Sequence, residues 1–188
     1  MKPPLGTPRL VLRPFVAADA AKLLRMSREE ALRTWIPSQV YRDEAHAASV
    51  LEFLMSQYEA PGDPRLGPYV LGVESRHSGE LIGHVGLSRF GDDVEVGFAI
   101  EMAQQGKGLA TEAVRAMCDW ACREFALPSI LGIAALGNRA SQAVLRKAGF
   151  ERERQETIRM QGVEQPVVFF RRARSHLPEE VQVAAADR

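Results

Sequence analysis

The feature that most constrains the fold is a change of hydrophobic period close to residue 100. Residues 69–75, 80–90 and 93–100 read as strands separated by short polar turns, and the third alternates Val94, Val96, Phe98 and Ile100 with smaller or polar residues. From Leu109 onward the apolar residues recur at helical spacing. This order predicts an antiparallel meander whose last strand runs, through a glycine-rich turn, into a long amphipathic helix.

The rest of the chain predicts further elements of one α/β domain. We expect a strand over 8–15, helices over 17–26 and 43–58, and a buried strand over 129–135 that is parallel to a neighbour because a helix connects the two. Asn138 is placed to cap a helix that Gly149 ends, and residues 151–160 and 166–173 form a closing hairpin. The predicted fold is an α/β (α+β) domain over residues 1–173, with a mixed central sheet of about seven strands flanked by about four helices. Residues 174–188 are expected to be a flexible tail.

Charge and composition exclude several classes of function. Lys plus Arg and Asp plus Glu both total 24, so no basic excess predicts a nucleic-acid partner. No apolar stretch is long enough to cross a membrane, and the N-terminus lacks a signal-peptide core. Cys118 and Cys122 lie on one helical face without further ligands nearby, which predicts packing residues rather than a disulfide or a metal site. We therefore expect a cytoplasmic protein without a metal.

The turn before the long helix, AQQGKGLATEA at 103–113, predicts an anion site. A helix N-terminus leaves N–H groups unpaired and carries the positive end of the helix dipole. Gly106, Gly108 and Ala110 leave that end unobstructed, Thr111 offers a hydroxyl, and Lys107 adds charge. The stretch fits neither a Walker loop nor the dinucleotide-binding fingerprint. The alternative interpretation is a glycine-rich turn with no ligand.

Taken together, EVGFAI, QGKGLATEA and, about thirty residues on, NRASQAVLRKAGF resemble the GCN5-related N-acetyltransferases. The likeness covers the chain from TPRLVLRPF to about residue 173 and is strongest for the branch that acetylates N-terminal amines of ribosomal proteins (RimJ/RimL-like). It implies direct transfer of acetyl from acetyl-CoA to an amine, without a covalent enzyme intermediate. It also implies splayed central strands that form the acyl-CoA cleft.

The resemblance assigns the cofactor residues. In that family Gln105, Gly108 and Ala110 belong to the pattern that holds the pyrophosphate, the pantetheine arm runs along the strand before it, and an asparagine matching Asn138 touches the arm. The implied set is Phe98, Ala99, Ile100, Gln105, Gly106, Lys107, Gly108, Leu109, Ala110, Thr111, Asn138 and Ser141.

Two side chains are the catalytic candidates. Glu95 is the carboxylate nearest the expected reaction centre and is either the base for the amine or an exposed strand glutamate paired with a cation. Glu112, its competitor, stands in the first helical turn, where a carboxylate stabilises the helix dipole. Relatives with serine at the position of Ser141 use it to protonate the thiolate, whereas a first-turn serine is also an ordinary helix starter. Leu145 departs from the tyrosine acid of many family members.

The acceptor is the least determined part of the prediction. Trp35 and His84 are weak substrate-contact candidates, with a loop anchor and a buried sheet histidine as the alternatives. The resemblance implies a primary amine, foremost a protein N-terminus, or otherwise a polyamine, amino acid or aminoglycoside. A non-catalytic acyl-CoA sensor of the same fold is a further alternative, and relatives are often homodimers.

Overall fold

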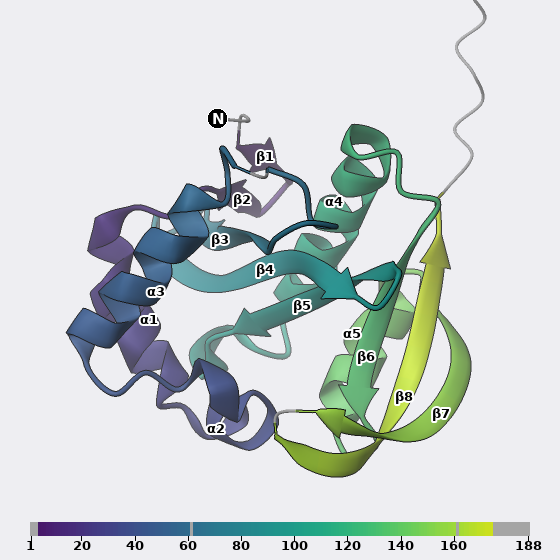
Figure 1. The fold of residues 1–188 in the computed structure, drawn as a ribbon. Helices are drawn as coiled ribbons and strands as arrows, with labels where there is room; N and C mark the ends of the chain where they lie inside the picture. The colour runs from purple at the N-terminus through teal and green to yellow at the C-terminus, as the bar shows by residue number, and fades with distance from the viewer. Residues whose placement is uncertain (1–3, 61, 161, 175–188) are drawn as a thin grey trace, which may run out of the picture.

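The computed structural model describes residues 4–60, 62–160 and 162–174, and Figure 1 shows its ribbon. Its strands form one mixed sheet in the order β1-β2-β3-β4-β5-β6-β8-β7. The first five strands are β1 (Leu5–Gly6), β2 (Leu10–Arg13), β3 (Tyr69–Ser75), β4 (Leu81–Phe90) and β5 (Asp93–Ile100). The other three are β6 (Ser129–Ala135), β7 (Glu151–Met160) and β8 (Val163–Ala173). All neighbouring pairs are antiparallel except β5 and β6, which are parallel as predicted.

Helices cover both faces of the sheet. On one face lie α4 (Leu109–Glu124) and α5 (Arg139–Lys147), whose apolar residues share the main core with Val94, Val96 and Ile100 of β5. On the other face lie α1 (Ala20–Ser27) and α3 (Glu44–Ser56), where Leu23 and Leu51 pack with Phe15 and Leu81. The short helix α2 (Glu30–Trp35) connects α1 to α3 (Figure 1).

The parallel strands β5 and β6 pair only briefly and then separate. Their register contains Glu95 with Leu131 and Val96 with Gly132, and no later residue of either strand joins it. The two ribbons run apart beyond this point in Figure 1. Residues 97–100 therefore pair with β4 on one side and leave their other edge open. This is the splay that the sequence resemblance implied.

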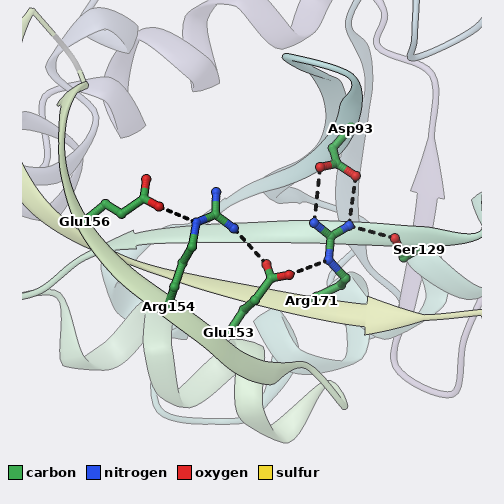
Figure 2. Close-up of polar contacts among 6 residues, drawn as sticks. All are labelled: Asp93, Ser129, Glu153, Arg154, Glu156 and Arg171. Carbon is green, nitrogen blue, oxygen red and sulfur yellow. Dashed lines mark hydrogen bonds and ion pairs between the residues drawn. The ribbon is translucent and has the colours of Figure 1, made fainter.

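A network of charged side chains holds the closed end of the splay together (Figure 2). Arg171 of β8 donates to both carboxylate oxygens of Asp93 on β5, at 2.8 and 3.2 Å, and to the Ser129 hydroxyl on β6 at 2.9 Å. It also pairs with Glu153 of β7 at 3.0 Å, and Arg154 continues the chain of ion pairs to Glu156. Because the hydrogen bonds from Arg171 favour the charged carboxylate, they lower the pKa of Asp93. Four strands are thus tied together on the side opposite the opening.

The structure corrects several predicted boundaries. Within the described residues there are eight strands and five α-helices, because the predicted seven and four omitted the two-residue β1 and the six-residue α2. Helix α2 starts after Glu29, whose side chain makes no capping hydrogen bond, so it lacked a sequence signal. The second strand of the final hairpin begins at Val163 rather than at the predicted residue 166. Pro166 lies inside β8, one residue beyond its last pair with β6, and there accepts a hydrogen bond from the Leu136 N–H.

Other predictions agree with the structure or fall outside its description. Cys118 and Cys122 are buried free thiols on α4, as packing residues should be, and burial raises the pKa of Cys118 to about 12. Gly149 ends the α5 segment with a φ of 92°. No helix among the described residues is long and apolar enough to cross a membrane. The predicted tail over 174–188 lies outside the described residues except for Arg174, whose N–H donates to the Pro128 carbonyl.

Candidate functional site

The head of α4 presents a row of backbone donors. Gly106 and Gly108 adopt φ of 75° and 77°, in the left-handed region that glycine tolerates. Gly108 is the N-cap of α4 and offers no side chain to the helix. Across the part of the chain that the structure describes, the N–H groups of residues 106–111 donate to no protein acceptor. Loop and helix end together therefore leave a contiguous set of N–H groups for an anion.

Two side chains of this loop form hydrogen bonds that fix its conformation. The Gln105 amide Nε2 donates to the Ile100 carbonyl at 2.9 Å, which fastens the loop to the end of β5. The Lys107 ammonium folds back onto the Ala103 carbonyl at 3.0 Å and the Gln104 amide oxygen at 2.9 Å. Lys107 thus adds positive charge to the region without covering the N–H groups.

The β1–β2 hairpin also contacts this loop, which the sequence did not predict. We call the contacts of Thr7 and Arg9 with Lys107 and Glu112 the strap. The Arg9 guanidinium donates to the Lys107 carbonyl at 2.8 Å and to the Glu112 carboxylate at 2.7 Å. The Thr7 hydroxyl and the Arg9 N–H also donate to Glu112, at 2.6 and 2.9 Å. Burial acts to raise the pKa of Glu112, but these hydrogen bonds outweigh it and hold the pKa below its usual range. Glu112 is therefore an anchor between β1–β2 and α4, and a poor proton acceptor.

Two further segments contain the remaining predicted cofactor residues. Phe98, Ala99 and Ile100 lie on the open edge of β5, with Ala99 and Ile100 buried. The Asn138 side chain caps α5 by accepting from the Ser141 N–H at 3.0 Å. The Ser141 hydroxyl makes no hydrogen bond to any other described residue. A Cβ added to the neighbouring Gly137 would stand 3.3 Å from the Trp35 ring, so α2 lies against this turn.

Leu145 occupies the apex of the splay. It is 1% exposed, and a Cβ added to Gly132 would lie 2.5 Å from its Cδ2. Gly132 pairs with Val96, the last residue of β5 joined to β6. The side chain at the position of the family's tyrosine acid is thus an apolar packing residue that cannot supply a proton.

Glu95 lies half-buried on the β5 face directed toward α1 and α3. Its register partner on β4 is Ser88, whose hydroxyl is 3.4 Å from its Oε1. Burial raises the pKa of the Glu95 carboxyl, and the Ser88 hydrogen bond offsets this in part. Among the described residues no lysine or arginine forms an ion pair with Glu95, and its hydrogen-bond partner is Ser88. Burial therefore makes this carboxylate a stronger proton acceptor than an exposed glutamate.

A cavity of about 220 Å³ is lined by Ser88, whose hydroxyl contacts this carboxylate. Its floor contains His84, Gly86 and Ser88 of β4 and Gly97 of β5, and its walls come from α1, α3 and the segment before α3. Burial lowers the pKa of His84 to about 4, so the imidazole is neutral at physiological pH. Trp35 does not line this cavity, so the structure separates the two weak substrate candidates. No group of three or more potential metal ligands gathers among the residues described.

The sequence could predict some of the residues around Glu95, the cavity and the loop, but not others. The two-residue turn at Gly91 and Asp92 fixes the β4–β5 register, which alone places Ser88 opposite Glu95 and His84 opposite Ala99. Arg9 and Gln39 had no comparable signal, because they reach the site from a hairpin and a connection that lie far away in the sequence.

Comparison with known proteins decides the family. Residues 9–151 match the model of the acetyltransferase (GNAT) domain. The chain belongs to the GNAT family. It is an N-acetyltransferase, and the N-acetyltransferase YoaA of Bacillus subtilis is 24% identical to it over 156 residues, spanning 81% of this chain and 85% of YoaA.

Solved GNAT structures share the fold. The ribosomal-protein-S5-alanine acetyltransferase from Vibrio fischeri superposes with a TM-score of 0.76 at 20% identity, covering 93% of this chain and 98% of that one. RimL, a ribosomal L7/L12 alpha-N-protein acetyltransferase solved in complex with coenzyme A, gives a TM-score of 0.76 at 15% identity, over 92% and 98% of the two chains.

Proposed function

We propose that this GNAT enzyme transfers acetyl from acetyl-CoA to a primary amine, and that the amine is the N-terminal α-amine of a polypeptide. The observation that carries the proposal is the set of N–H groups at residues 106–111, which donate to no acceptor among the described residues and lie where the β5–β6 splay opens. The relatives acting on ribosomal proteins support the choice of acceptor.

The residues present fit the cofactor. A diphosphate requires several converging donors and no side chain in the way, which residues 106–111 provide. A pantetheine arm contains amides that can pair with an open strand edge, which Phe98, Ala99 and Ile100 provide. Asn138 stands at the facing turn. When bound, the thioester supplies an acyl carbon that is electrophilic enough for direct attack by an amine.

Side chains of the protein then accept and donate the protons of the reaction. Glu95 accepts the proton that the amine loses as its nitrogen bonds to the acyl carbon, either directly or through a water. The carbon–sulfur bond breaks, and the Ser141 hydroxyl delivers a proton to the departing thiolate and regains one from solvent. An N–H group on the open edge of β5 is available as a donor to the acyl oxygen and would stabilise its developing charge. Amide and free thiol are the products.

The anion site is tested most cleanly at Gly106. A Cβ at Gly108 would lie 3.6 Å from the Arg9 guanidinium, so an aspartate there could be neutralised, whereas Gly106 has open space around it. Gly106→Asp places a carboxylate beside the N–H groups and should weaken acetyl-CoA binding by at least tenfold in calorimetry. Gly79→Asp is the matched control, because Gly79 has a φ of 69°, equally open space and a position in the β3–β4 turn. Equal affinity in the two variants would refute the site.

Release of free thiol from acetyl-CoA measures the activity with each candidate amine. Turnover with N-terminal peptides supports the proposed acceptor, and turnover with small amines alone contradicts it.

A further inference from the structure

The cavity beside Glu95 has the dimensions of a side-chain pocket. At about 220 Å³ it is smaller than the roughly 300–1,000 Å³ typical of sites for drug-sized ligands. Its walls are largely apolar and include Leu23, Val50, Leu54 and Val70. A compact substituent fits such a space, and an oligosaccharide-sized amine does not.

The pocket carries no formal charge. None of the residues that line it is Asp, Glu, Lys or Arg. Its titratable members are His84, whose pKa burial lowers to about 4, and Tyr41, whose pKa burial raises, so both are neutral near pH 7. An ammonium or carboxylate on a substituent that filled the pocket would lose its hydration without gaining a counter-charge from the lining residues.

One polar atom in the pocket lacks a partner. The side-chain oxygen of Gln39 is buried and accepts no hydrogen bond from the described residues. A buried acceptor without a donor costs free energy, which a ligand that supplies an N–H or O–H would recover. Gln39 is the last residue of the short turn Pro37–Gln39, which lies between α2 and α3 and contributes Gln39 to the lining of the pocket.

The pocket lies next to the proposed base, Glu95, on the same face of the sheet. Ser88 and Gly97 line the cavity, Gly97 follows Glu95 at the next position on the same face of β5, and the Ser88 hydroxyl contacts the Glu95 carboxylate. An amine at Glu95 would therefore direct the substituent on its α-carbon into the cavity.

We propose that the acceptor is an α-amine whose residue carries a compact, uncharged side chain with an N–H or O–H donor, and that Gln39 recognises this donor. The inference rests on the proposed acetyltransferase function. It selects peptides beginning with residues such as Thr or Tyr, and it excludes polyamines, aminoglycosides and peptides beginning with Asp or Lys.

The test compares kcat/KM for peptides that differ only in the first residue. The neutral peptides form two pairs, Thr/Val and Tyr/Phe, and peptides beginning with Asp or Lys are the charged members. The two side chains of a pair have nearly the same shape and differ by a hydroxyl. We expect a fivefold to tenfold preference for the hydroxyl in at least one pair, the size of one hydrogen bond, and at least a hundredfold discrimination against charge. Gln39→Leu should abolish the hydroxyl preference while retaining activity on the apolar member. Gln155→Leu, on the exposed face of β7, is the control and should leave the preference intact.

Each outcome can be assigned. Turnover in which Asp or Lys peptides equal the neutral ones, or in which Gln39→Leu leaves the pair ratios unchanged, overturns the pocket inference and leaves the enzyme standing. Absence of thiol release from every peptide, together with intact acetyl-CoA binding, overturns the proposed function itself and the pocket inference with it.

Discussion

At the scale of single residues, the proposed chemistry depends on one carboxylate, Glu95, whose burial raises its pKa. Glu95 must be deprotonated to act as a base, so kcat/KM should fall as the pH drops through its pKa, which burial has raised above the ordinary 4.5. The amine itself becomes neutral in solution only near its own pKa of about 8. A base is therefore needed most at low pH and least at high pH.

Glu95→Gln should consequently lose most activity near pH 6 and recover part of it by pH 9, where the amine deprotonates without help. The measurement is the pH profile of kcat/KM with a saturating thioester. Ser88→Ala provides a graded companion, since its hydroxyl opposes the rise in the pKa of Glu95 and its removal should move the acidic limb to higher pH. A profile of unaltered shape in Glu95→Gln would show that another group takes the proton.

At the scale of elements, the glycine-rich loop before α4 is held in position by contacts from a different part of the sheet. Glu112 binds Thr7 and Arg9 together, and Arg9 in turn binds the Lys107 carbonyl, so the β1–β2 hairpin braces the head of α4. Glu112→Gln retains the shape of the side chain and removes the charge that holds the guanidinium.

We expect Glu112→Gln to lower the free energy of unfolding by about 1 kcal/mol, because the strap is partly exposed, and to weaken acetyl-CoA binding several-fold. Urea titration and calorimetry measure the two effects. The acidic limb of the pH–rate profile should stay where it is in the wild type. A shifted limb would instead assign the base to Glu112.

The elements themselves were largely predictable, and their long-range contacts were not. The period-two stretches that became β3, β4 and β5 and the helical pattern of α4 followed from local rules, as did the Asn138 cap and the Gly149 stop. Helix α2 escaped prediction because six residues without a capping signal do not rise above the loop pattern. The unpaired Gln39 oxygen escaped because its burial depends on how α1 and α3 pack over the sheet.

At the scale of the whole molecule, the sheet consists of two blocks joined at a narrow seam. Strands β1 to β5 form one block and β6, β8 and β7 the other, and the seam between β5 and β6 has the two register pairs at Glu95 and Val96. The Asp93–Arg171 ion pair secures the closed end (Figure 2), while the opposite end has no strand pairing. A ligand that lies in the opening would bridge both blocks.

This arrangement predicts where hydrogen exchange changes when acetyl-CoA binds. N–H groups without protein acceptors exchange rapidly, so residues 106–111 and the open edge of residues 97–100 should be labile in the free protein and protected in the complex. The β7 strand at 151–160 lies at the far edge of the second block and should exchange at the same rate in both states.

Gly106→Asp should lose the protection at 106–111 at the same ligand concentration, whereas Gly79→Asp should keep it. Protection confined to the α1–α3 face, with residues 106–111 unchanged, would place the cofactor away from the helix end and contradict the arrangement. Protection at 106–111 but not at 97–100 would support the diphosphate site at α4 and contradict pairing of the pantetheine arm with the open edge of β5. The acyl group would then have to reach Glu95 by another path.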